Sequence, residues 1–226
     1  FTIAVLSYLD LAEYFLPYYL TIVIAGFAAA VIMPRIPPLS KKPDLPCEGV
    51  ELIKEEAIPD SLSPLKWGLK QALERAGKNS GISATVKEGC RNVLDMWLGV
   101  LPLVMMIGTT ALMIAEYTPL FAILGKPFEP LLALLQVPEA EKAAQTMVVG
   151  FADMFLPAVI GSGIESEMTR FVIAGVSVTQ LIYMSELGGL LLGSNLPLKI
   201  KDLILIFLLR TVITLPIIVA AGHLLF

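Results

Sequence analysis

The chain has 226 residues, of which 56% are hydrophobic and only 16% carry a charged side chain. Soluble domains contain nearer a quarter of charged residues, so this composition argues against a soluble domain and indicates a membrane protein. The formal net charge of −4 gives no support for nucleic-acid binding. Because the first residue is Phe1 and not Met, we expect that the start was removed or that the sequence belongs to a longer protein.

The first predicted membrane span is Tyr14–Met33. It carries no charged residue and has about the 20 residues that a spanning helix needs. Pro17 lies in its first turn, where the missing backbone N–H of proline costs least. Residues 1–33 are therefore predicted to be an N-terminal transmembrane part that continues a longer chain.

Residues 34–92 have a different composition, because most of the Lys and Arg residues of the chain lie there. Loops rich in these residues stay on the cytoplasmic side of a membrane, so this segment is predicted to be a cytoplasmic loop. It also contains Cys47 and Cys90, which form no CxxC pair and have no nearby His. We therefore expect two free thiols and no metal site.

Within this loop, Ser63–Lys78 is predicted to be a short amphipathic helix, with Ser63 as its N-cap and Gly77 as its stop. Its lysines lie away from its apolar face. Two roles fit this pattern: a helix lying on an anionic bilayer surface, and a linker helix packed on its own protein. The sequence does not separate them. The apolar face consists of Leu65, Leu69, Ala72, Leu73 and Ala76.

Residues 93–226 are predicted to form a Gate-like transmembrane domain, for reasons given below. Two apolar runs in it, Thr118–Val137 and Ala143–Gly163, are interrupted by Pro, Gly and charged residues. The basic flanks require an even number of crossings there, so these runs form either re-entrant hairpins or two tilted crossings. The predicted fold is all-α, a polytopic membrane helical bundle with broken or re-entrant helices. The runs long enough to cross are Val93–Ala115, which contains Asp95 and Pro102, Phe171–Leu192, and Ile200–Leu225, which contains Arg210.

Two breaks are predicted in these apolar runs, at "FLPAVIGSGIES" (Phe155–Ser166) and at "ILGKPFEPLL" (Ile123–Leu132). Broken helices expose free backbone N–H and C=O groups at membrane depth, and they are tolerated where they line a cavity. Two interrupted hydrophobic segments are therefore a sequence-level indication of a transporter binding site.

A continuous helix is predicted from Glu165 to Leu187, and at 100° per residue it carries a polar stripe from Glu165 to Tyr183. Such a stripe should face the protein interior or water, because lipid would leave its polar groups unsatisfied. It either lines a transport pathway or holds the bundle together by interhelical hydrogen bonds. The candidate solute-binding residues on and around it are Asp153, Ser162, Glu165, Thr169, Ser177, Gln180, Tyr183 and Glu186.

Arg170 and Arg210 are the candidate structural or coupling charges. Arg210 lies within the last apolar run, and an ionisable group at membrane depth usually faces a partner or a wet cavity. Arg210 either snorkels to the interface or pairs with a carboxylate, for which Glu186 and Asp153 are the first choices.

The stretch from Gln145 to Leu203, which contains "GFADMFLPAVIGSGIESEMTRF", resembles the C-terminal half of the YjiH family. These are bacterial inner-membrane proteins of the nucleoside-recognition, or Gate, domain group. The Gate domain also occurs in spore maturation proteins and in ferrous-iron transport B proteins, and is similar to part of concentrative nucleoside transporters. The resemblance implies a multi-pass protein of the bacterial inner (cytoplasmic) membrane and a solute such as a nucleoside. It also implies pairing of two halves, so a homo-oligomer is an expected partner.

Three functions follow from these observations. The leading one is a transporter or channel for a small polar organic solute, with Asp153, Glu165 or Glu186 coupling a proton or Na⁺. The second is a non-transporting membrane assembly or regulatory scaffold, as in the spore maturation proteins. The third, an enzyme, is not expected, because the sequence has no nucleophile motif or P-loop and its one His is His223, and no cofactor is expected. A wet, polar cavity containing Gln180 and Glu165 would favour transport, and a dry interface the scaffold.

Overall fold

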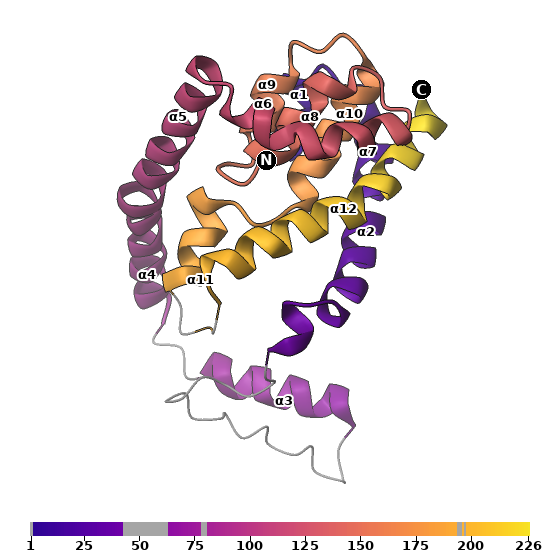
Figure 1. Cartoon of the computed structure of the whole chain (residues 1–226). Helices are drawn as coiled ribbons and strands as arrows, with labels where there is room; N and C mark the ends of the chain where they lie inside the picture. The colour runs from indigo at the N-terminus through magenta and orange to yellow at the C-terminus, as the bar shows by residue number, and fades with distance from the viewer. Residues whose placement is uncertain (1, 43–62, 78–80, 194–195, 197) are drawn as a thin grey trace. The chain divides into compact units, whose positions relative to one another are not determined.

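The computed structural model describes residues 2–42, 63–77, 81–193, 196 and 198–226 (Figure 1). These residues form helices and turns and contain no strand, which confirms the predicted all-α class. Cys47 and the rest of residues 43–62 of the predicted loop lie outside the described residues. The helices are α1 (Thr2–Tyr8), α2 (Phe15–Ile32), α3 (Pro64–Gly77), α4 (Ile82–Asp95), α5 (Leu101–Tyr117), α6 (Leu120–Gly125), α7 (Glu129–Leu134), α8 (Ala140–Val149), α9 (Leu156–Gly161), α10 (Glu167–Thr179), α11 (Gly189–Gly193) and α12 (Ile200–Leu225).

In the described part of the chain, four helical stretches are long and apolar enough to cross a membrane. Each contains one of the spans predicted from the sequence, so the multi-pass membrane character is confirmed. The stretch Ser83–Tyr117 is longer than the predicted span Val93–Ala115, because α4 continues through a π-helical turn at Met96–Val100 into α5. The four stretches are Ala12–Lys41, Ser83–Tyr117, Glu167–Leu192 and Ile200–Leu225.

The chain divides into two compact units, one of residues 1–42 and 103–226 and the other of residues 43–102. In the first unit, α2, α10 and α12 pack against one another, as Figure 1 shows. The N-terminal transmembrane part therefore folds together with the C-terminal part of the chain.

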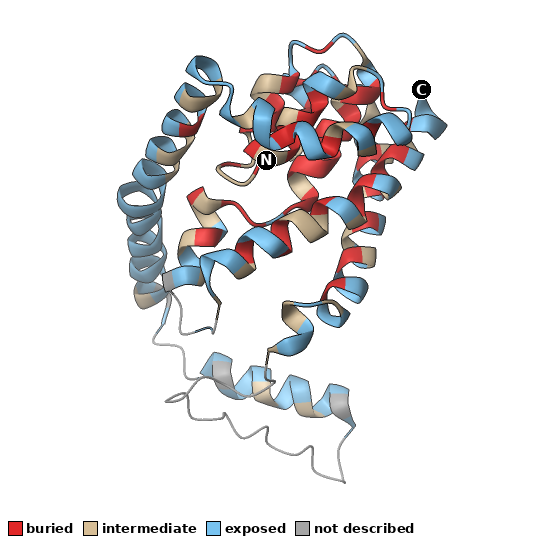
Figure 2. Ribbon diagram, in the orientation of Figure 1, coloured by how far each residue is buried: buried red, intermediate tan, exposed pale blue. Residues whose placement is uncertain are grey.

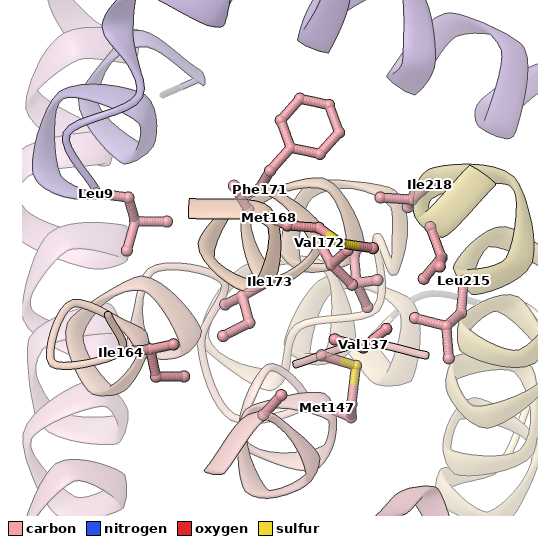
Figure 3. Close-up of a cluster of buried hydrophobic side chains, with 14 of the residues drawn as sticks. Leu9, Val137, Met147, Ile164, Met168, Phe171, Val172, Ile173, Leu215 and Ile218 are labelled. Carbon is pink, nitrogen blue, oxygen red and sulfur yellow. The ribbon is translucent and has the colours of Figure 1, made fainter. Parts of the chain in front are cut away.

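The core of this first unit is built around α10, where every residue from Phe171 to Ser177 is buried (Figure 2). Figure 3 shows side chains of α8, α10 and α12 meeting there, with Met147 and Leu215 among them. At Gly175, an added Cβ would lie 2.7 Å from Cγ2 of Ile218. The lack of a side chain at this position lets α10 and α12 approach closely, as small residues do in membrane bundles.

Between residues 118 and 163 the described helices are short, and the longest, α8, has ten residues. A spanning helix needs about 20 residues, so none of these helices crosses alone. The re-entrant alternative is the one that these lengths support. At the predicted break, Ile123–Leu132, the α-helix is interrupted by a 3-10 turn at Lys126–Phe128, which separates α6 from α7 without a non-helical residue between them. Pro127 and Pro130 lie at the start of the 3-10 turn and of α7, where helical geometry tolerates proline.

Candidate functional site

The first interruption of the membrane part separates α8 from α9. Residues 150–155 are non-helical, as predicted around Asp153 and Pro157, and Pro157 lies in the first turn of α9. The Asp153 side chain is buried, and its Oδ1 accepts a hydrogen bond from the backbone N–H of Phe155 at 2.8 Å. The carboxylate thereby satisfies a backbone donor that the interruption sets free.

The second interruption was not predicted. The continuous helix expected from Glu165 to Leu187 is wrong: α10 ends at Thr179, residues 180–183 are not helical, and a π-helical turn follows at Met184–Gly188. Leu181 adopts the left-handed conformation with φ 60°, which a branched side chain rarely takes. Strain of this kind persists only where surrounding contacts enforce it.

Those contacts satisfy the backbone carbonyl groups that the end of α10 leaves free. The Tyr183 hydroxyl donates to the carbonyl oxygens of Ser177 at 2.7 Å and Val178 at 2.9 Å. Arg210, on α12, donates from Nε to the carbonyl oxygen of Thr179 at 2.9 Å. Side chains thus replace the next turn of the helix, which is how broken helices are tolerated in membranes.

The two interruptions meet in space. The backbone N–H of Met184 donates to the carbonyl oxygen of Phe151 at 2.8 Å, and that of Ser185 donates to the carbonyl oxygen of Ala152 at 3.1 Å. The Ser185 hydroxyl also donates to Oδ2 of Asp153 at 2.9 Å. We call this arrangement of residues 150–155 and 180–185 the crossing. It joins two unwound segments through backbone groups and one buried carboxylate.

Gln180 lies at the crossing and is fully buried. Its Nε2 donates to the carbonyl oxygen of Met147 and to Oγ1 of Thr211, both at 2.8 Å. Its Oε1 has no hydrogen-bond partner among the described residues and is directed at Gly150, where an added Cβ would collide with it. A buried acceptor without a donor is uncommon, and it leaves one polar group at the crossing free to receive a hydrogen bond.

Other predicted residues of the polar stripe are buried inside the protein and bonded to its backbone. Thr169 donates to the carbonyl oxygen of Pro138, and Ser177 donates to that of Ala174. The inward orientation agrees with the sequence-based expectation. The Thr169 bond joins α10 to the turn before α8, which is the bundle-holding role left open by the sequence, whereas the Ser177 bond stays within α10.

The structure does not bring all the predicted site residues together. Glu165 and Ser162 are exposed and precede α10, whereas Gln180 follows it, and α10 is about 20 Å long. Glu186 is half-buried in the π-helical turn beside Ser185. The crossing therefore gathers Asp153, Gln180 and Tyr183 with Glu186 nearby, and it excludes the residues at the start of α10.

The two candidate arginines have structural partners. Arg170 donates to the carbonyl oxygen of Leu9 at 2.7 Å and lies 3.8 Å from a carboxylate oxygen of Asp10, which ties α10 to the turn after α1. Arg210 forms no ion pair with a carboxylate in the part of the chain that the structure describes. Of the two alternatives that the sequence left open for Arg210, the pair with Glu186 or Asp153 is therefore not formed, and its Nε donates to a backbone carbonyl group.

A cavity of about 750 Å³ borders the crossing at Phe151, Ala152 and Met184. Its remaining lining is apolar and comes from α5, α6, α7, α8 and α12 and the turn between α6 and α7. Neither Gln180 nor Glu165 lines this cavity. A separate, more polar cavity of about 370 Å³ is lined by Glu116, Gln145 and Ser162 among others.

Sequence reasoning missed one residue of the crossing, Ser185, and one residue of α12 that binds to it, Thr211. Ser185 binds Asp153 and Thr211 binds Gln180, yet each looks unexceptional in an apolar helix. The sequence did contain a signal for Thr211. Two threonines, Thr211 and Thr214, follow Arg210 at one and four positions, which indicates a polar patch on α12 beside Arg210. Ser185 offered no comparable signal.

Comparison with known proteins gives a relative without a described function. The chain is 53% identical over all of its 226 residues to an uncharacterized protein of Alkalihalophilus pseudofirmus. It spans about half, 49%, of the length of that relative. No protein-family model matches the chain. No solved structure matches it either.

Proposed function

We propose that this multi-pass membrane protein transports or conducts a small polar organic solute, which binds at the crossing. The observation that carries the proposal is the meeting of two unwound segments through the Met184–Phe151 and Ser185–Ala152 backbone hydrogen bonds. Irregular backbone at membrane depth is characteristic of transporter sites, where its N–H and C=O groups bind substrate and coupling ion.

The residues of the crossing have the chemistry for this role. Among the described residues, the carboxylate of Asp153 is held by the N–H of Phe155 and the hydroxyl of Ser185, and it is suited to bind a proton or Na⁺. The free Oε1 of Gln180 accepts a hydrogen bond from a solute hydroxyl or amine. Opening the crossing would release four further backbone groups for the solute. The resemblance to Gate-domain proteins makes nucleosides the first class to test.

A thermal-stability screen of the purified protein with nucleosides, nucleobases and metal ions tests binding. A bound solute raises the melting temperature by an amount that grows with the logarithm of its concentration over its Kd. We expect a selective increase that Asp153→Asn or Gln180→Ala abolishes and Ser162→Ala preserves. If Ser162→Ala alone abolished it, the solute would bind in the polar cavity lined by Glu116 and Gln145 and not at the crossing.

Uptake into proteoliposomes then separates transport from binding alone. A solute that raises the melting temperature should accumulate inside vesicles, and a pH or Na⁺ gradient should drive it. Asp153→Asn, which abolishes binding, should abolish this uptake as well. Binding without uptake for every stabilising solute would contradict the proposal.

The second candidate is a non-transporting assembly or regulatory scaffold. The apolar lining of the 750 Å³ cavity beside the crossing favours it, as does the engagement of Nε2 of Gln180 by the protein itself. Under this function, Asp153 and Ser185 only hold the fold together. Their substitution would then lower the melting temperature, and no solute would be bound or taken up.

A further inference from the structure

Helix α3 (Pro64–Gly77) carries a leucine face that its own protein leaves exposed. Leu65, Leu69 and Leu73 lie on one side of the helix, and their exposed fractions are 83%, 61% and 65%. The sequence allowed two roles for this helix, as a linker packed on its own protein or as a helix on a bilayer surface. Packing on the described residues of its own unit, 43–102, would bury the leucines, so their exposure argues against the first role within that unit.

The opposite side of α3 is the side that is partly covered. Trp67 and Gln71 are half-buried and lie one turn apart, away from the leucines. The ammonium group of Lys70 lies 5.7 Å from the centre of the Trp67 ring. The leucine face is therefore the exposed face of α3 and is free to meet another surface.

Helix α3 lies between two candidate membrane spans in the sequence, which keeps it close to a membrane surface. Four residues separate Gly77 from Ile82, where the helix that includes the candidate span Ser83–Tyr117 begins. The candidate span Ala12–Lys41 precedes α3 in the chain. A helix tethered between two spans stays close to the bilayer, which gives its leucine face a high effective concentration of lipid.

The charges of α3 specify the kind of surface. Lys66 lies about 20° from Leu73 around the helix, and Lys70 about 60°. Lysines at the border of an apolar face extend toward lipid headgroups while their methylene stems stay in contact with apolar surface. The basic residues near the spans predict that α3 lies on the cytoplasmic side, where the bilayer surface is anionic.

We infer that α3 lies on an anionic bilayer surface with Leu65, Leu69 and Leu73 inserted among the lipids. Glu74 supplies a matched control position for Leu69. It is exposed on the same helix and lies about 140° away around the helix axis. A nitroxide spin label at each position reports whether that position is in lipid or in water.

The test uses the full chain in vesicles of phosphatidylglycerol, with Cys47→Ser and Cys90→Ser as background for Leu69→Cys or Glu74→Cys. Oxygen concentrates in lipid and a nickel chelate in water, so their collision rates with the label distinguish the two. We expect the oxygen-to-nickel ratio to be several-fold higher at position 69 than at position 74. Lys66→Gln with Lys70→Gln should lower the ratio at 69, and so should replacing the vesicle lipid with phosphatidylcholine.

Two results would overturn the inference. Equal access of the nickel chelate to both positions in anionic vesicles would place the leucine face in water. An immobilised label at 69 that neither reagent reaches would place it against protein, such as a second copy of the chain. If the oxygen-to-nickel ratio at position 69 did not change with lipid charge or with the lysine substitutions, the surface that α3 binds would not need to be anionic, which would contradict that element of the inference.

Discussion

The hydroxyl of Ser185 donates to Oδ2 of Asp153 over 2.9 Å and joins two unwound segments that are 32 residues apart in the sequence. This bond lies beside two backbone hydrogen bonds between the same segments. One carboxylate therefore stabilises both interruptions, because its other oxygen accepts from Phe155 within the first of them. Any change that frees Asp153 should loosen both segments together.

Replacing Asp153 by Ala should destabilise the protein by about 2 kcal/mol or more, because the buried N–H of Phe155 and hydroxyl of Ser185 lose their acceptor. In a double-mutant cycle with Ser185→Ala, the two changes should be non-additive by about 1 kcal/mol. Reversible unfolding in detergent, followed by circular dichroism, measures each variant. Strict additivity would mean that the Ser185–Asp153 bond contributes nothing to stability.

Substitution of Gly150 by Ala tests the close approach of Gln180. The new Cβ would collide with Oε1 of Gln180, and overpacking of this kind costs about 1–3 kcal/mol. Gly163→Ala is the control, since an added Cβ there meets no atom within 4 Å. Melting temperatures should fall for Gly150→Ala only, and the effect should shrink in a Gln180→Ala background, where the obstructing amide is gone. An equal loss in both backgrounds would assign the effect to the backbone of Gly150.

The sequence predicted those features that depend on local composition. The spans follow from uninterrupted apolar runs, and Pro157 with Asp153 marked the first interruption. The second interruption was beyond its reach, because the residues of 180–183 suit a helix by themselves. What ends α10 is the contact of its last carbonyl groups with Tyr183 and with Arg210, which is 31 residues from Thr179. Periodicity over one helix carries no information about such a distant donor.

Replacing Arg210 by Leu should destabilise the second interruption by about 1–3 kcal/mol, because the carbonyl group of Thr179 loses its donor. Neutralising the nearby carboxylate with Glu186→Gln should not restore stability, since Arg210 forms no ion pair with it. The melting temperatures of the single and double variants decide between the two arrangements. Rescue by Glu186→Gln would indicate that the charges of Arg210 and Glu186 interact in the membrane.

The start of α10 should make stability dependent on pH on the acid side. The Glu139 carboxylate accepts from the backbone N–H groups of Glu165 at 3.1 Å and Ser166 at 3.2 Å and pairs with Lys142 at 2.7 Å. The hydrogen bond from Lys142, followed by that from the Ser166 N–H, holds the pKa of Glu139 below its ordinary value of 4.5.

A carboxyl group whose pKa is lowered by folding stabilises the folded state above its unfolded pKa, and that stability is lost as the pH falls through the folded pKa. The melting temperature of the parent protein should therefore fall below about pH 4.5 more steeply than that of Glu139→Gln. Glu141→Gln, which removes an exposed carboxylate on the same helix, should keep the parent profile. Parallel profiles for the parent and Glu139→Gln would show that this carboxylate does not hold the start of α10.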